Sequence, residues 1–186
     1  FLIMKKGFTL LELLIVIGIL AILATAVTLV LNPAELLKQA RDGNRLNDLR
    51  ALNNALGLFI VASSTLPIDS FYCSNASGGQ YVTSTAPASC GNNAITAVNG
   101  TGWVNVNFAS MQGGSPLSRL PLDPINTASS SAYIYRSNSD GSKFELNANM
   151  ESDKYSVGGK NDVESNTKDG GDNAGLYEIG ASLNLF

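Results

Sequence analysis

Few side chains in this sequence could support chemistry, and histidine is absent. Without an imidazole there is no His base, no Ser-His or Cys-His nucleophile pair and no His-ligated zinc. Neither a G-x-S-x-G motif nor a phosphate-binding glycine loop occurs. We therefore expect a protein that is not an enzyme. Three features remain of interest: a carboxylate near an apolar run, a pair of cysteines, and a group of acidic residues near the C-terminus.

The composition limits the classes of protein that are possible. The chain has 186 residues, of which 45% are hydrophobic and only 15% are charged. This is enough apolar material for one packed domain, and it excludes global disorder. The net charge of -3 argues against a protein that binds nucleic acid through contacts to its phosphates, so no nucleic acid is expected as a partner.

The most unusual segment is an apolar run from Phe8 to Leu31. No charge occurs from Leu13 to Leu31, and a helix of that length covers roughly 28 Å, close to a bilayer core. The polar side chains within the run are Thr9, Glu12, Thr25 and Thr28. The sequence therefore predicts a helix that spans a membrane once.

The residues before this run predict its orientation. Phe1 cannot be an initiator residue, so Met4 is the expected start. Lys5 and Lys6 form a short basic region, which the positive-inside rule keeps in the cytoplasm. We expect a single-pass protein of the cytoplasmic (inner) membrane, with everything after Leu31 outside.

Two ordinary explanations of this N-terminus are a secretory signal peptide and a simple signal anchor. Ala24-Thr25-Ala26 looks like a signal-peptidase site. The apolar run continues beyond it, however, and neither explanation gives a reason for Glu12, since a carboxylate is costly in an apolar span.

A third interpretation accounts for the carboxylate. Gly7-Phe8-Thr9-Leu10-Leu11-Glu12, followed by the apolar helix, resembles the processing motif of type IV prepilins and type II secretion pseudopilins. The resemblance implies that a prepilin peptidase cuts after Gly7 and that Phe8 becomes an N-methylated first residue. It also implies that Glu12 serves assembly by pairing with the Phe8 amine of a neighbouring subunit, which gives an intramembrane charge a partner.

The chain divides into four expected segments: a leader at 1–7, a membrane and filament-core helix at 8–31, an amphipathic helix at 32–65, and a head at 66–186. Small residues at Gly18, Ala21, Thr25 and Thr28 form one stripe of the first helix, which permits close helix packing. At Pro33 the helix either ends and a new one starts, or one long helix kinks.

The second helix shows helical periodicity from about residue 34 to 62. The apolar residues expected on its buried face are Leu37, Ala40, Leu49, Leu52, Leu56, Phe59 and Ile60. The charged residues expected in solvent or between subunits are Arg41, Asp42, Arg45, Asp48 and Arg50.

The head begins with a polar stretch, residues 66–102, which predicts a long loop. It contains Cys73 and Cys90, the only cysteines. An even number of cysteines in an exported segment predicts one disulfide, and two free thiols are the alternative.

Strands are expected at 103–108, 132–136, 143–150 and 177–179, from period-two patterns and turn residues. Asp140-Gly141 predicts a hairpin. Leu120-Pro121-Leu122-Asp123-Pro124 is turn-forming and resembles an element of major pseudopilins. The fold class predicted is α+β: a long N-terminal helix, apolar then amphipathic, packed on a small antiparallel sheet.

An acidic loop occupies 152–175. A solvated loop is the plain interpretation, but major pseudopilins carry calcium in a C-terminal loop of this kind. The resemblance therefore implies a structural calcium, with Asp162, Asp169 and Asp172 as candidate ligands. No other cofactor is expected.

The predicted function is a structural subunit of a type IV pilus-like filament, either a pseudopilin of a secretion system or a pilus pilin. Expected partners are copies of itself, minor pilin-like subunits, the prepilin peptidase, an inner-membrane assembly platform and the lipid bilayer. The filament would be extracellular or periplasmic. The alternative is a membrane-anchored module that binds glycans or surfaces through Trp103, Tyr81 or Tyr72.

Overall fold

The computed structural model describes residues 7–63, 65–68, 71–74, 80–82, 87–89, 94–127 and 131–185. The chain divides into two compact units, Phe1–Leu37 and Lys38–Phe186. The first unit contains an apolar helix. The second contains the sheet and the hydrophobic core.

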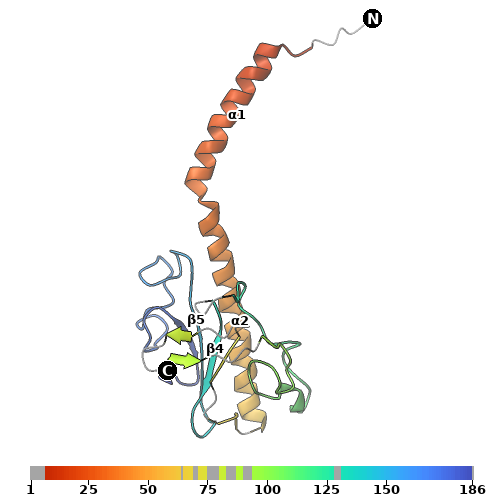
Figure 1. Cartoon of the computed structure of the whole chain (residues 1–186), viewed down its shortest axis with the longest axis vertical. Helices are drawn as coiled ribbons and strands as arrows, with labels where there is room; N and C mark the ends of the chain where they lie inside the picture. The colour runs from red at the N-terminus through yellow and green to blue at the C-terminus, as the bar shows by residue number, and fades with distance from the viewer. Residues whose placement is uncertain are drawn as a thin grey trace, which may run out of the picture. The chain divides into compact units, whose positions relative to one another are not determined.

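The apolar helix α1 (Leu10–Leu31) makes up most of the first unit (Figure 1). Its segment Leu10–Thr28 has a mean hydropathy of 2.8, and its large apolar side chains are exposed. The hydroxyls of Thr25 and Thr28 donate to carbonyls one turn back in the helix, at 2.8 and 2.9 Å. The polar groups are thus satisfied inside the helix, as a hydrocarbon environment requires.

The chain interrupts its helix at Asn32. This residue caps α1 in the left-handed conformation, with φ 39 and ψ 74, a conformation that asparagine tolerates better than most residues. The second helix, α2 (Pro33–Ser63), then begins with proline in its first turn, where the missing N–H is not needed. Of the two possibilities at Pro33, the structure has the first: one helix ends at Leu31 and another starts.

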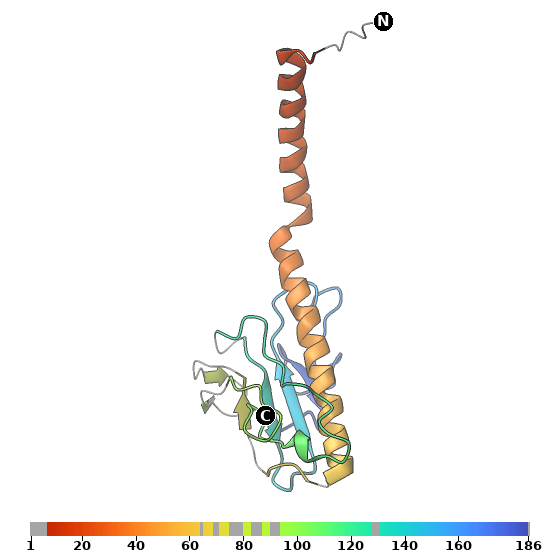
Figure 2. The same ribbon diagram turned by 90° about the vertical axis from the view of Figure 1, so that its right-hand side faces the viewer.

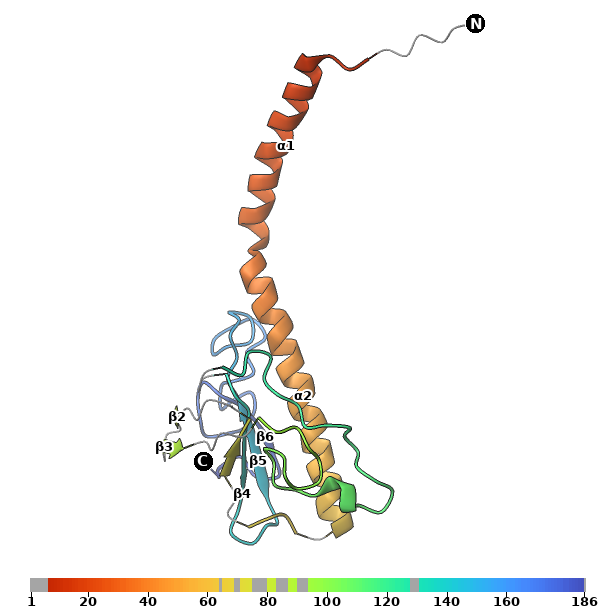
Figure 3. The ribbon, with the colours of Figure 1, turned by 45° about the vertical axis from the view of Figure 1, so that its right-hand side comes forward.

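The second unit contains a four-stranded antiparallel sheet with strand order β1-β4-β5-β6 (Figure 2). A separate antiparallel pair joins β2 to β3 (Figure 3). The strand bounds are β1 Phe71–Cys73, β2 Gln80–Val82, β3 Pro87–Ser89, β4 Ile134–Ser137, β5 Phe144–Ala148 and β6 Tyr177–Gly180. Together with the helices these strands confirm the α+β class.

The predicted hairpin at Asp140-Gly141 joins β4 to β5. Gly141 has φ +68, and a Cβ at this position would collide with the carbonyl oxygen of Leu66. Only glycine fits both conditions. The Gly141 carbonyl in turn accepts a hydrogen bond from the Leu66 N–H at 2.9 Å, which ties the end of α2 to the hairpin.

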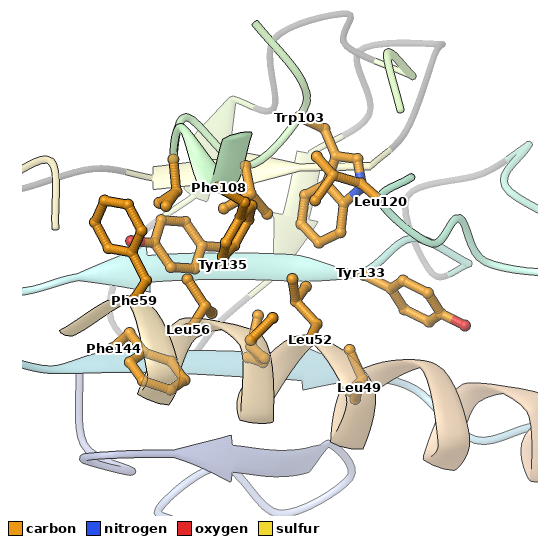
Figure 4. Close-up of a cluster of buried hydrophobic side chains, with 14 of the residues drawn as sticks. Leu49, Leu52, Leu56, Phe59, Trp103, Phe108, Leu120, Tyr133, Tyr135 and Phe144 are labelled. Carbon is orange, nitrogen blue, oxygen red and sulfur yellow. The ribbon is translucent and has the colours of Figure 1, made fainter. Parts of the chain in front are cut away.

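The core lies between α2 and one face of the sheet (Figure 4). Leu49, Leu52 and Leu56 are fully buried on the helix, and the rings of Phe59 and Phe108 meet edge to face at 5.9 Å. Trp103 is also fully buried, and its indole N–H donates to the Pro121 carbonyl at 2.8 Å. Trp103 is therefore a core residue and cannot stack on a glycan.

The prediction of a strand at 103–108 was wrong. The chain there is irregular, with one bridge between Asn99 and Asn107 and a short 3-10 helix at Phe108–Ser110. Trp103 and its neighbour Val104 are both fully buried. The segment is held by hydrogen bonds to the loop before it, such as Trp103 N–H to the Ile95 carbonyl at 2.9 Å.

Two further expectations need correction. Leu37 was expected on the buried face of the second helix, but it is 62% exposed, because the buried face of α2 begins only beyond Ala40. The long loop expected at 66–102 contains the strands β1, β2 and β3. Each has three residues, too few for a period-two pattern. The pairing partner of β1, β4, lies about sixty residues away.

The core predicts unequal effects for two leucines of α2. Leu56→Ala should lower the free energy of unfolding by about 2–5 kcal/mol, because a fully buried side chain leaves a cavity. Leu58→Ala is the matched control, since Leu58 is 54% exposed, and should change it by less than about 1 kcal/mol. Thermal unfolding of the full chain in detergent micelles measures both. Equal losses would contradict this assignment of the core.

Candidate functional site

The segment that carries the processing motif is short and open. Gly7, Phe8 and Thr9 precede α1 without regular secondary structure, and Phe8 is 81% exposed. The bond between Gly7 and Phe8 therefore lies in accessible chain just before a helix. A peptidase could bind such a segment without first unfolding it.

The fold gives no reason for glycine at position 7. A Cβ there would meet no atom within 4 Å, and its φ does not lie in the left-handed region. Glycine is usually required by a turn, a positive φ or a close approach. None of these holds at Gly7 within the described residues.

Glu12 is held by the first turn of α1 in a capping box. Its Oε2 atom accepts hydrogen bonds from the backbone N–H of Thr9 at 2.9 Å and from the Thr9 hydroxyl at 2.8 Å. The Thr9 hydroxyl oxygen accepts in return from the Glu12 N–H at 3.2 Å. The arrangement satisfies orphan donors of the helix start and places a negative charge at the positive end of the helix dipole.

Within residues 7–63 and the other described ranges, one oxygen of Glu12 has no hydrogen-bond partner. Among the described residues only Thr9 bonds to the carboxylate, through Oε2. The other oxygen, Oε1, is free to accept from a donor outside the chain. Thr9, which the sequence analysis did not single out, is the residue that fixes the carboxylate, and the Thr-x-x-Glu spacing was the signal for it.

The predicted Cys73–Cys90 disulfide stays a prediction. Cys73 lies in β1 and is buried. Cys90 lies outside the described residues.

The structure places the three candidate calcium ligands in separate hydrogen-bonded turns. Asp162 accepts from the N–H groups of Gly158, Glu164 and Ser165 at 2.9–3.0 Å and from the Ser165 hydroxyl. Hydrogen bonds from Ser165 and then Gly158 lower the pKa of Asp162 to about 2.

The other two candidates have donors of their own. Asp169 accepts from the N–H groups of Gly171 and Glu178 at 3.0 and 3.2 Å, and Asp172 from the Asn173 side chain at 3.2 Å. Within the described ranges, no three His, Cys, Asp or Glu side chains gather where they could hold a metal ion. Calcium binding by the three aspartates therefore stays a prediction.

The second unit contains a cluster of charged residues that includes Asp42 and Arg45. The sequence analysis did not predict that these two residues are buried. Arg45 is fully buried. Its Nε and Nη2 donate to both oxygens of Asp123 at 2.6 and 3.1 Å, its Nη1 donates to Asp42 at 2.7 Å, and its Nη2 also pairs with Glu151. Arg41 pairs with the same Glu151 at 2.6 Å.

The carboxylates of this cluster also bind backbone. Asp42, itself fully buried, accepts from the N–H groups of Glu151 and Ser152 at 2.9–3.2 Å and from the Ser152 hydroxyl at 2.6 Å. Asp123 accepts from the N–H of Ile125 at 2.8 Å. The cluster therefore fastens α2 to the loops that follow Leu120 and Met150.

The charge state of Arg45 follows from these contacts. Burial alone would lower its pKa, but the hydrogen bonds and charge of Asp123, and then the bonds of Glu151 and Asp42, raise the pKa above its ordinary value. The guanidinium is thus firmly charged, and it is partnered in the plane by carboxylates.

Arg41, Asp42 and Arg45 were expected on a solvated face, and for Asp42 and Arg45 that was wrong. The i, i+3 spacing of Asp42 and Arg45 is the same as in an ordinary surface pair. The deciding partners, Asp123 and Glu151, lie in distant loops. The available signal was Asp123 inside the turn-forming Leu120–Pro124 segment.

The cluster predicts a large effect for one arginine. Arg45→Ala should lower the free energy of unfolding by about 3–5 kcal/mol, because it leaves the buried Asp42 and Asp123 without a counter-charge. Arg50→Ala, at an exposed site of the same helix, is the control and should change it by less than about 1 kcal/mol. Thermal unfolding of the full chain in micelles measures both. A tolerated Arg45→Ala would show that the cluster does not hold the loops.

Comparisons with known proteins give one match. Residues 3–28 match a family described as the prokaryotic N-terminal methylation motif. No curated protein and no solved structure matches the chain. The matched segment contains the Gly7-Phe8 bond, the capping box at Thr9 and Glu12, and most of α1. The N-terminal segment of this chain, residues 3–28, therefore carries the prepilin-type signature of type IV pilins and pseudopilins.

Proposed function

We propose that this protein is a structural subunit of a type IV pilus-like filament. It is inserted in the membrane as a prepilin, cleaved after Gly7, methylated on Phe8 and then polymerised. The observation that carries the proposal is the position of Glu12: a carboxylate with one free oxygen, at the start of an exposed apolar helix, four residues after an accessible Gly-Phe bond.

The apolar helix and the prepilin-type motif fit a membrane-anchored, single-pass protein. The 22 residues of α1 cover about 33 Å, which matches a bilayer core. The basic Lys5 and Lys6 keep the leader in the cytoplasm by the positive-inside rule. A prepilin peptidase would hydrolyse the Gly7–Phe8 bond on that side and leave a new amine on Phe8.

Assembly follows from the charges that this cleavage creates. The new amine at Phe8 and the carboxylate of Glu12 both sit at the end of an apolar helix, where an unpaired charge is unfavourable. Thr9 occupies Oε2 of Glu12, so Oε1 is the oxygen that accepts from the Phe8 amine of another copy. Pairing between copies gives both charges a partner, and the exposed apolar side chains of α1 pack together in the filament.

Within this class we favour a pseudopilin of a secretion system over a pilus pilin. The Leu120–Pro124 segment, which resembles major pseudopilins, supplies Asp123 to the buried Arg45, so it has a structural role here. The predicted disulfide and the Ser/Thr-rich loop would suit a surface pilin. Further expected partners are minor pilin-like subunits and an inner-membrane assembly platform.

The alternative of an anchored glycan-binding module has less support. Trp103 is fully buried, Tyr72 is half-buried and stacked on Tyr135 with ring centroids 6.5 Å apart, and the side chain of Tyr81 lies outside the described part. The known role of pilin-type proteins is structural, which agrees with a protein that does no chemistry of its own.

Processing gives the first test. Protein isolated from its native membrane should begin at Phe8 and carry one N-methyl group, because the Gly7–Phe8 bond has the family's motif and is accessible. Intact-mass measurement and Edman sequencing decide it. A mature chain that begins at Val27 would instead establish a secretory signal peptide.

Assembly gives the second test. Glu12→Ala should leave membrane insertion intact or improve it, because a charge leaves the apolar span. Filament yield should fall by about tenfold or more, because the Phe8 amine loses its partner. Glu35→Ala, which removes a carboxylate outside the apolar span, is the control. Sheared-filament yield is compared at equal subunit levels, and a normal yield from Glu12→Ala would refute the assembly role.

A further inference from the structure

The sheet has a second buried face, opposite the core, and part of this face is polar. Glu145 and Asn147 of β5 are both fully buried, and Glu178 of β6 is 2% exposed. In the antiparallel register Asn147 pairs with Glu178 and Glu145 pairs with Gly180. The two glutamates are thus diagonal neighbours on one face.

The antiparallel register places the side chains of Glu145 and Glu178 next to each other on this face. Each carboxyl group affects the pKa of the other. Oε1 of Glu145 and both amide atoms of Asn147 are buried without a hydrogen-bond partner of ordinary geometry among the described residues. The Asn147 side chain is nevertheless close enough to lower the pKa of Glu145. Two carboxylate oxygens cannot bond to each other unless one of them carries a proton.

The last residues of the chain and the loop before β6 cover this pair. Oε2 of Glu145 accepts from the Leu185 N–H at 2.7 Å, and Oε2 of Glu178 accepts from the Asn173 N–H at 3.0 Å. A Cβ on Gly171 would collide with the Glu178 carboxyl group. Water can therefore reach the pair only if residues 181–185 or the loop move away.

Among the described residues, no ion pair joins a basic side chain to either glutamate. Arg136 of β4 is opposite Glu145 in the register and has an interaction of its own. Arg50 and Lys168 line a pocket together with Glu178. The Asp169 charge opposes ionisation of Glu178. Strand β1 brings only Phe71 and Cys73 to this face. The covering residues 181–185 carry no charged side chain.

We propose that Glu145 and Glu178 share one proton across β5 and β6, and that this proton is a pH-sensitive latch that keeps residues 181–185 closed over the sheet. When the proton is lost, two adjacent buried carboxylates must be hydrated. Hydration requires the C-terminal segment to open.

The pKa values of Glu145 and Glu178 are shifted in the direction that the latch requires. Burial, and then the hydrogen bond to Glu178, raise the pKa of Glu145 to about 8, and burial also raises the pKa of Glu178. The closed state therefore binds more protons than the open one. Its stability is fully present below about pH 4.5, the ordinary pKa of glutamate, and is lost as the pH rises through about 8.

Hydrogen–deuterium exchange of the full chain in detergent micelles tests the latch. After correction for intrinsic exchange rates, opening of residues 181–185 should rise by up to about tenfold per pH unit between about pH 5 and pH 8. In Glu145→Gln the opening should be low and independent of pH, because the amide can donate to Glu178 and accept from Leu185 as the protonated acid does. Glu178→Gln is a second variant with the same expectation.

Asp153→Asn, at an exposed carboxylate of the neighbouring loop, is the control and should keep the wild-type pH profile. The infrared carbonyl band of protonated acids near pH 8 should be weaker in Glu145→Gln than in the wild type, with Glu164, whose pKa is raised to about 7, contributing equally to both. A flat profile in the wild type, or the same slope in Glu145→Gln, would overturn the proposal. So would closure of the wild type by millimolar calcium above about pH 8, since the pair would then be a cation site.

Discussion

The fold of the second unit depends on Arg45, which is charged although it is buried away from water. A buried guanidinium is tolerated only when its donors are all paired, and Arg45 finds these partners on α2 and in two loops far along the chain. The leucines of α2 could fill the same core from a neighbouring turn of the helix, because apolar contacts are not directional. The ion cluster is directional, and we infer that it fixes the register of α2 against the loops.

In the loops of this protein, carboxylate side chains accept hydrogen bonds from backbone N–H groups that would be paired with backbone carbonyls in a helix or strand. Glu164 is buried and accepts from the N–H groups of Met150 and Val157 at 2.6 and 3.2 Å. Burial raises its pKa to about 7. Asp42, Asp123 and Asp162 bind backbone N–H groups in the same way. An acidic segment with little helix or strand can therefore hold one structure, since its backbone donors are satisfied by side chains.

Local patterns predicted the parts of the fold whose causes are local. The apolar helix, the hairpin at Gly141 and the strand β5 all depend on neighbours in sequence. Arg45 could not be placed correctly, because Asp123 is 78 residues away. Glu145 and Asn147 looked like the solvent side of a strand. They are buried because the end of the chain returns over them, and no pattern within β5 contains that information.

The break at Asn32 has a consequence for the depth of α1 in a bilayer. Carbonyls in the last turn of a helix have no helical donors, and Pro33 has no N–H to offer. Such carbonyls are unfavourable in hydrocarbon but are readily hydrated. In the membrane-anchored state that we propose, the end of α1 therefore favours the water interface, and the carboxylate of Glu12 favours the opposite interface. The two polar ends would then set one preferred depth for the apolar helix before any neighbour is bound.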